Sequence, residues 1–220
     1  MQSRSFRTGV AVFALCVAVA TPSQATLIEY IDRGAFEAAA GELERRDFDA
    51  FRLETAFRDR PLDLGDVTVQ GFGTGQLDRN AVDIPEVAFP EFDLAGTTVL
   101  SLLVNDTSWV QFEFDAPVVA CGADFAGLNY GAESTIVDVE GRSARPPAAG
   151  GNVKTFFGVM SDTPFRTLRL IHRENTGSDG FGLDNLVFEV PEPGTLLVLA
   201  AAAGLLRRRG RTRRAPSNHP

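Results

Sequence analysis

The segment with the densest set of possible ligand groups is NTGSDGFGLDNLVFEV, residues 175–190. Alternate residues of a strand point to opposite faces, and around Asp184 both sets are apolar. Leu186 and Phe188 are at even spacing from Asp184, and Leu183 is at odd spacing. An ionised carboxylate beside an apolar core is costly unless it is hydrogen-bonded, paired with a cation or bound to a metal. Asp184 is therefore the first candidate for a site residue.

Calcium is the metal that such a carboxylate would suit in a secreted protein, because calcium takes carboxylate and carbonyl oxygens. A partial N-x-G-x-D-G run precedes Asp184, but Leu186 stands where an EF-hand would have its final Glu. Asp49 and Glu54 are candidate second ligands from an early predicted strand. The alternative is that Asp184 and Asn185 cap backbone groups at the rim of a sheet, so a structural calcium ion stays one of two interpretations.

Other residue types offer little chemistry. Trp109, the one tryptophan, is either a core residue or a stacking surface for a sugar. His172 follows Leu168 and Leu170 at a period of two, which predicts a strand end that faces the core. No zinc site, Ser-His-Asp set or Cys-His pair can be assembled. The sequence favours a non-enzymatic protein, with a carboxylate-based glycoside hydrolase as a remote alternative.

These residues have to be positioned by an almost entirely β fold. Residues 30–48 form the one convincing helical stretch, with Asp32 as its possible cap. Beyond it, nine short segments alternate with turn residues, and in WVQFEF the apolar side chains occupy every second position. The sequence therefore predicts an all-β protein, an antiparallel β-sandwich with one short N-terminal helix.

The N-terminal residues 1–25 have the order of a secretory signal peptide: two arginines, an apolar run and a small-x-small ending. Residues 26–190 then make one domain with 13 basic and 28 acidic residues, a net charge of −15. Such a surface repels nucleic acid, so no nucleic-acid partner is expected. Cys121 is the one cysteine of this domain, and its apolar surroundings predict a buried, inert thiol.

The C-terminal segment PEPGTLLVLAAAAGLLRRRGRTRR, residues 191–214, differs from the rest of the chain. Its 13 residues from Gly194 to Leu206 would make a helix of about 20 Å, against roughly 30 Å of hydrocarbon in a bilayer. Arginine clusters remain on the cytoplasmic side. A short, transient membrane helix is expected here, held by the arginines that follow it: Arg207, Arg208, Arg209 and Arg211, then Arg213 and Arg214. Residues 215–220 form a tail.

The order of Pro191, Glu192 and Pro193, an apolar helix and a terminal arginine cluster resembles the PEP-CTERM sorting signal. The resemblance implies recognition of these three residues by exosortase, a membrane protease of Gram-negative, polysaccharide-producing bacteria. Similar tails are grouped with the C-terminal domain of ice-binding-type proteins. The segments FDAPVVACGADFAG, FFGVMSDTPFRTLRL and DGFGLDNLVFEVPEP are similar to the domain that such proteins carry, which implies a jelly-roll-like sandwich.

Three functions follow in order of preference. The first is a non-enzymatic protein of the cell surface or extracellular matrix, exported through the inner membrane, briefly anchored there, and associated with exopolysaccharide in a biofilm. The second is a calcium-dependent carbohydrate-binding module. The third is the carboxylate-based glycoside hydrolase. The ligand itself is not encoded in any motif of the chain.

Overall fold

A computed structural model describes residues 26–58, 60–73, 80–83, 92, 94, 97–129, 135–148, 153–173 and 177–190. Within these ranges the chain is mostly antiparallel β-sheet with a single α-helix, as the sequence predicts. The N-terminal elements are β1 (Leu27–Tyr30), α1 (Arg33–Ala39), β2 (Glu44–Arg46), β3 (Leu62–Asp63), β4 (Val67–Gly73) and β5 (Ala81–Asp83). The C-terminal elements are β6 (Val99–Asn105), β7 (Ser108–Ala126), β8 (Thr135–Val139), β9 (Arg142–Ala144), β10 (Thr155–His172) and β11 (Ser178–Glu189).

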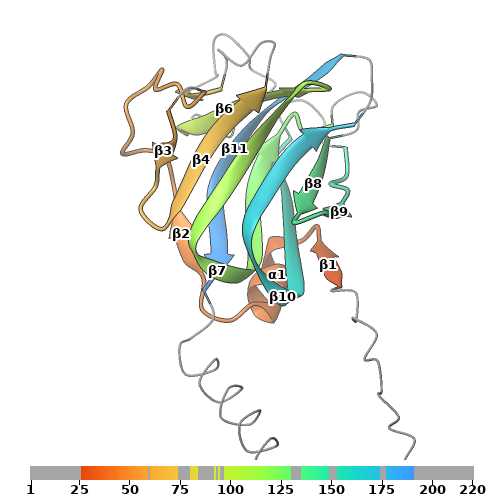
Figure 1. Cartoon of the computed structure of the whole chain (residues 1–220). Helices are drawn as coiled ribbons and strands as arrows, with labels where there is room; N and C mark the ends of the chain where they lie inside the picture. The colour runs from red at the N-terminus through yellow and green to blue at the C-terminus, as the bar shows by residue number, and fades with distance from the viewer. Residues whose placement is uncertain are drawn as a thin grey trace, which may run out of the picture.

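The strands form two facing layers that are joined by the long strands β7 and β10 (Figure 1). In the first layer, β4 pairs with the first half of β7, which pairs with the second half of β10, and β8 and β9 follow. In the second layer, β1 pairs with the first half of β10, and the second half of β7 pairs with β11, next to β6 and β5. The result is a β-sandwich whose layers are parts of one hydrogen-bonded sheet.

Four segments that the sequence predicts as separate strands therefore form two single bent strands. The predicted strands 109–114 and 118–127 lie mostly within β7, which ends at Ala126, and the predicted strands 152–160 and 165–173 overlap β10, which begins at Thr155 and ends at His172. The β7–β10 register shifts between Met160 and Thr167, opposite the part of β7 that contains Pro117. Such bulges bend a strand and increase its local twist. Residues 51–57, expected as a strand, contain only an isolated bridge at Ala56.

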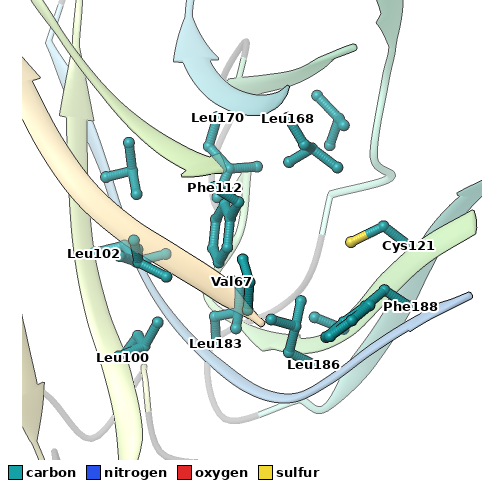
Figure 2. Close-up of a cluster of buried hydrophobic side chains, with 14 of the residues drawn as sticks. Val67, Leu100, Leu102, Phe112, Cys121, Leu168, Leu170, Leu183, Leu186 and Phe188 are labelled. Atoms are coloured by element: carbon teal, nitrogen blue, oxygen red, sulfur yellow. The ribbon is translucent and has the colours of Figure 1, made fainter. Parts of the chain in front are cut away.

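The core lies between the two layers and follows the predicted alternation (Figure 2). Val110, Phe112 and Phe114 of β7 are buried, while Gln111 and Glu113 point outward. Cys121 is buried in the same core, as expected. At about 25 cal/mol per Å² of apolar surface removed from water, these side chains supply the main stabilisation of a domain without a disulfide.

Helix α1 is shorter than the sequence predicts, because β2 begins at Glu44 and pairs with β11. Asp32 caps the helix: its Oδ1 accepts the Ala35 N–H at 2.7 Å. Phe36 packs on the outer face of the second layer, where a Cβ on Gly158 would come within 2.8 Å of its ring. Glycine therefore permits the close approach of helix to sheet at this position.

Both ends of the described domain are at the same end of the sandwich. The β7–β10 bend, β1 and the end of β11 lie near α1, whereas β4 ends and β7 begins at the opposite end (Figure 1). No helix within the described ranges has the length and apolar character that crossing a membrane requires. The expected signal peptide, membrane helix and tail lie outside the described residues.

Candidate functional site

The outer face of the first layer carries two rows of side chains at the end opposite α1. The strand registers align Phe72 with Trp109, and Trp109 with Ile171, as an apolar row across β4, β7 and β10. Two residues further along each strand, Gln70, Gln111 and Arg169 form a polar row. Partners in adjacent antiparallel strands point to the same side of a sheet. We call these six residues the Trp109 face.

Contacts within the Trp109 face fix several of its side chains. The rings of Phe72 and Trp109 stack within 11° of parallel, with centroids 5.6 Å apart. Arg169 Nε donates to Gln111 Oε1 at 2.9 Å. All six residues are partly or fully exposed, and Trp109 is half-buried rather than a core residue. Its indole Nε1, however, is buried and makes no hydrogen bond. The sequence leaves Trp109 open between core and stacking surface, and the sheet places it on the outside.

Gly73 brings the end of β4 close to the turn before β7. Its φ is +98°, and a Cβ there would come within 2.0 Å of the carbonyl oxygen of Thr107. Only glycine accepts both this backbone conformation and this contact. The position of Phe72 beside Trp109 therefore depends on the residue that follows it.

The sequence has apolar residues at both alternating positions around Asp184, and the structure places Asp184 on the outer face of the second layer. Asn185 has φ +51° and forms a β-bulge, so the register of β11 with β7 shifts between Asp184 and Val187. Leu186 consequently faces the core although Asp184 faces outward. The prediction that Asp184 shares a face with Leu186 is wrong because an inserted residue reverses the alternation.

The bulge places Asp184 directly opposite Asp124 of β7, and both side chains are nearly inaccessible. Arg33 of α1 bonds Asp124 through Nε at 3.1 Å, and Lys154 Nζ lies 2.7 Å from its other oxygen. The amide Nδ2 of Asn185 donates to both carboxylates, at 3.1 Å each. A buried carboxylate with two cationic partners is well compensated, so Asp124 serves to hold α1 on the sheet.

Asp184 has hydrogen bonds but no cationic partner among the described residues. Its oxygens accept the Asn185 N–H at 2.6 Å and the Thr97 hydroxyl at 3.0 Å. Burial raises the pKa of Asp184 above its ordinary value, the negative charges of Asp49 and Asp124 raise it further, and these two hydrogen bonds lower it. The proposed capping role of Asp184 fits this arrangement, since its first partner is a backbone N–H.

The calcium ligands predicted from the sequence are only partly brought together. Asp49 lies near enough to act on Asp184 electrostatically, and its Oδ1 accepts the Thr98 N–H at 3.4 Å. Glu54 is exposed in a turn, and its backbone N–H donates to the Val82 carbonyl. Within the described ranges, no three His, Cys, Asp or Glu residues are grouped to hold a metal. The oxygens of Asp184 already accept hydrogen bonds, so this arrangement gives a calcium site little support, and calcium stays a prediction.

A second cluster of buried polar side chains lies at the end of the core opposite α1. Asn129, with φ +55°, bonds Thr135 through both its amide nitrogen and oxygen, and its backbone N–H donates to Asp179 at 3.0 Å. His172 ends β10 and faces the core, as predicted. Both of its ring nitrogens and the neighbouring Thr135 hydroxyl are buried, and none of them has a hydrogen-bond partner in the part of the chain that the structure describes. Apart from the predicted position of His172, no pattern in the sequence indicates this cluster.

Comparison with known proteins does not assign a family. No family model matches the chain, and no curated protein does. One similar solved structure is the tandem CBM51 modules of a family 98 glycoside hydrolase from Streptococcus pneumoniae, with 13% identity and a TM-score of 0.37 over 66% of this chain. The match spans only about half, 47%, of that structure. Another is the K2 cleaved adhesin domain of Lys-gingipain, with 12% identity and a TM-score of 0.34, covering 75% of this chain and 100% of that one.

The sequence alone could indicate two of the six residues of the Trp109 face. The alternation in WVQFEF puts Trp109 and Gln111 on one side of a strand, but Phe72 and Arg169 join them only through strand pairing. Asp124 and Arg33 were likewise not predicted, because nothing in the sequence marks the register of β7 with β11. The predicted sorting residues Pro191, Glu192 and Pro193 and the arginines Arg207, Arg208, Arg209 and Arg211 lie outside the described residues.

Proposed function

We propose that the protein is a non-enzymatic, exported protein of the cell envelope that is sorted through residues 191–214 and associates with exopolysaccharide. The observation that supports this most directly is the placement of the chain ends. β1 and the end of β11 lie at one end of the sandwich, and the Trp109 face lies toward the other (Figure 1). A C-terminal segment held in a membrane would leave the Trp109 face near the end of the sandwich that is farther from the bilayer.

The state of the carboxylates supports a non-enzymatic role. A glycoside hydrolase needs two carboxyl groups that flank a bound sugar, one of them able to give up a proton. Asp124 and Asp184 are the buried opposed pair of this fold, and their side chains are covered by Arg33, Asn185 and Thr97. A sugar cannot reach the Asp124 oxygens without displacing Arg33 of α1, or those of Asp184 without displacing Thr97 and Asn185. We also propose that the β-sandwich is of the jelly-roll-like type.

Cell fractionation tests the sorting part of the proposal. The wild-type chain and a Glu192→Ala variant are expressed in a bacterium that has an exosortase, and each is followed by mass and location. We expect the wild type to lose its C-terminal segment and reach the outer envelope or the medium, while the variant keeps this segment and stays in the inner membrane. Identical mass and location for both chains would contradict exosortase processing.

A glycan array tests the binding part, with and without calcium. Binding that persists in EDTA is the expected result, because the Trp109 face contains no metal-ligand group. Binding that requires calcium would instead favour the calcium-dependent carbohydrate-binding module. Release of reducing sugar from a bound polysaccharide would contradict the non-enzymatic assignment.

A further inference from the structure

The Trp109 face combines the two kinds of surface that a sugar ring needs. A pyranose has C–H groups that pack against aromatic and aliphatic side chains, and hydroxyls around its edge that need hydrogen-bond partners. The apolar row of Phe72, Trp109 and Ile171 supplies the first surface. The polar row lies two residues along each strand, about 7 Å away at the usual strand rise. Both rows run across the strands, so a sugar chain lying across the sheet would contact them together.

The polar row has hydrogen-bonding groups to spare. Among the described contacts, Arg169 uses its Nε for Gln111 and leaves both terminal guanidinium nitrogens without a protein acceptor. Gln111 uses only its Oε1, so its amide nitrogen remains a donor. Gln70 Nε2 donates to the Arg58 carbonyl at a long 3.4 Å, and its own oxygen can accept. The row thus offers one acceptor at Gln70 and donors at Gln111 and Arg169, and a sugar hydroxyl can bond to either kind of group.

The indole N–H of Trp109 is an independent sign of a missing partner. It is buried and has no acceptor among the residues that the structure describes, although buried polar groups in native proteins nearly always have one. The Phe72 ring is stacked on the indole and offers no acceptor. Because the nitrogen is buried, a ligand hydroxyl would reach it only after the side chains around it move.

Charge decides which class of glycan fits. The domain of residues 26–190 has a net charge of −15, yet Arg169 is the one charged residue of the Trp109 face, and Asp138 of β8 lies directly opposite it on the same side of the sheet. Acidic glycans are repelled by the domain as a whole, and one guanidinium does not offset that field. Amide groups and a guanidinium can form hydrogen bonds to neutral hydroxyls, and no anion has to be removed from water for this contact. The local chemistry therefore matches an uncharged polysaccharide.

We propose that the Trp109 face binds an uncharged polysaccharide chain that lies across β4, β7 and β10, with its sugar rings on the apolar row and its hydroxyls on the polar row. This inference rests on the proposed association with exopolysaccharide and names its site and ligand class. It requires no metal ion. It also places binding away from Asp124 and Asp184, which lie on the opposite layer.

Fluorescence tests the site directly, because Trp109 is the only tryptophan in the chain. The full chain is titrated with soluble neutral polysaccharides (galactomannan, dextran and hydroxyethylcellulose) and with alginate as the anionic comparison. We expect at least one neutral polymer to shift the tryptophan emission and to reduce quenching by acrylamide, and alginate to do neither. Tighter binding of alginate than of every neutral polymer would overturn the charge argument.

Affinity electrophoresis in gels that contain the same polymers separates the two proposals. Trp109→Ala and Arg169→Ala are expected to weaken retardation, Trp109→Ala by about tenfold in Kd. Trp109→Phe should retain part of the binding, and a thermal melt of each variant verifies that it is folded. Ile31→Ala is the matched control, since Ile31 is 68% exposed near β1 at the other end of the domain.

Each result has one meaning. If the wild type binds a neutral polymer and folded Trp109→Ala binds it equally well, the Trp109 face is the wrong site while glycan association stands. If the wild type binds no polymer at all, both the association with polysaccharide and this inference fail. If Ile31→Ala weakens binding as much as Trp109→Ala does, the effect of the tryptophan substitution is not local and the inference also fails.

Discussion

Asp124 and Asp184 lie directly opposite each other on β7 and β11, yet their carboxylates have different electrostatic environments. Arg33 and Lys154 contact Asp124, whereas Asp184 accepts hydrogen bonds only from neutral groups among the described residues. The Asn185 amide links the two. Two adjacent buried carboxylates are stable here because one is neutralised by cations and the other has a raised pKa.

Replacing Asp184 by Asn should flatten the dependence of stability on pH. Because the folded-state pKa of Asp184 is raised above its ordinary value of 3.8, its favourable contribution is complete below that value and is lost as pH rises through the folded-state pKa. One proton changes the free energy of unfolding by at most about 1.4 kcal/mol per pH unit. Urea unfolding from pH 4 to pH 8 should show the wild type losing stability relative to Asp184→Asn, and parallel curves would contradict the assignment.

Removing the Arg33 side chain should destabilise the domain substantially. Arg33→Ala leaves the buried Asp124 carboxylate with Lys154 alone and breaks the bond from Arg33 to the Asn185 carbonyl. Loss of one partner from a buried ion pair costs about 3 kcal/mol. Arg45→Ala is the matched control: Arg45 is exposed and contacts Glu37 at 3.0 Å, so about 0.5 kcal/mol or less is expected. Equal losses in urea unfolding would show that Asp124 does not depend on Arg33.

The thiol of Cys121 should be unreactive in the folded protein. Burial raises its pKa to about 12, and only the thiolate is nucleophilic. A Cys16→Ser variant of the full chain isolates Cys121, since the chain has two cysteines. We expect a disulfide reagent at pH 8 to label it only after guanidinium is added. Labelling of the native protein at the rate of a free thiol would mean that the core opens frequently at β7.

Substituting His172 by Leu should leave stability unchanged or raise it by about 1 kcal/mol. The wild-type side chain buries two ring nitrogens without partners, and replacing unpaired buried polar atoms with apolar ones removes their desolvation cost. Asn129→Ala is the contrasting variant, because Asn129 makes hydrogen bonds to Thr135 and Pro146, and a loss of about 2 kcal/mol is expected. A clear loss in His172→Leu would indicate an internal water held by the imidazole.

Local residue patterns determined much of this protein. The alternation of WVQFEF gave the inward and outward sides of β7, Asp32 marked the start of α1, and the apolar run around Cys121 indicated a buried thiol. The sequence also predicted an antiparallel β-sandwich with one N-terminal helix. These features depend on the side chains within a few residues of one another, so they can be read before any long-range contact is known.

The tertiary structure decided the rest, because it depends on strand register. Sequence alternation placed Asp184 with Leu186, but the bulge at Asn185 reversed the sides and set Asp184 opposite Asp124. The bends that make β7 and β10 single strands likewise arise from pairing across the sheet. Phe72 and Trp109 are far apart in the chain and stack only because β4 pairs with β7. A one-residue change in register moves a side chain to the other face, and no local pattern specifies it.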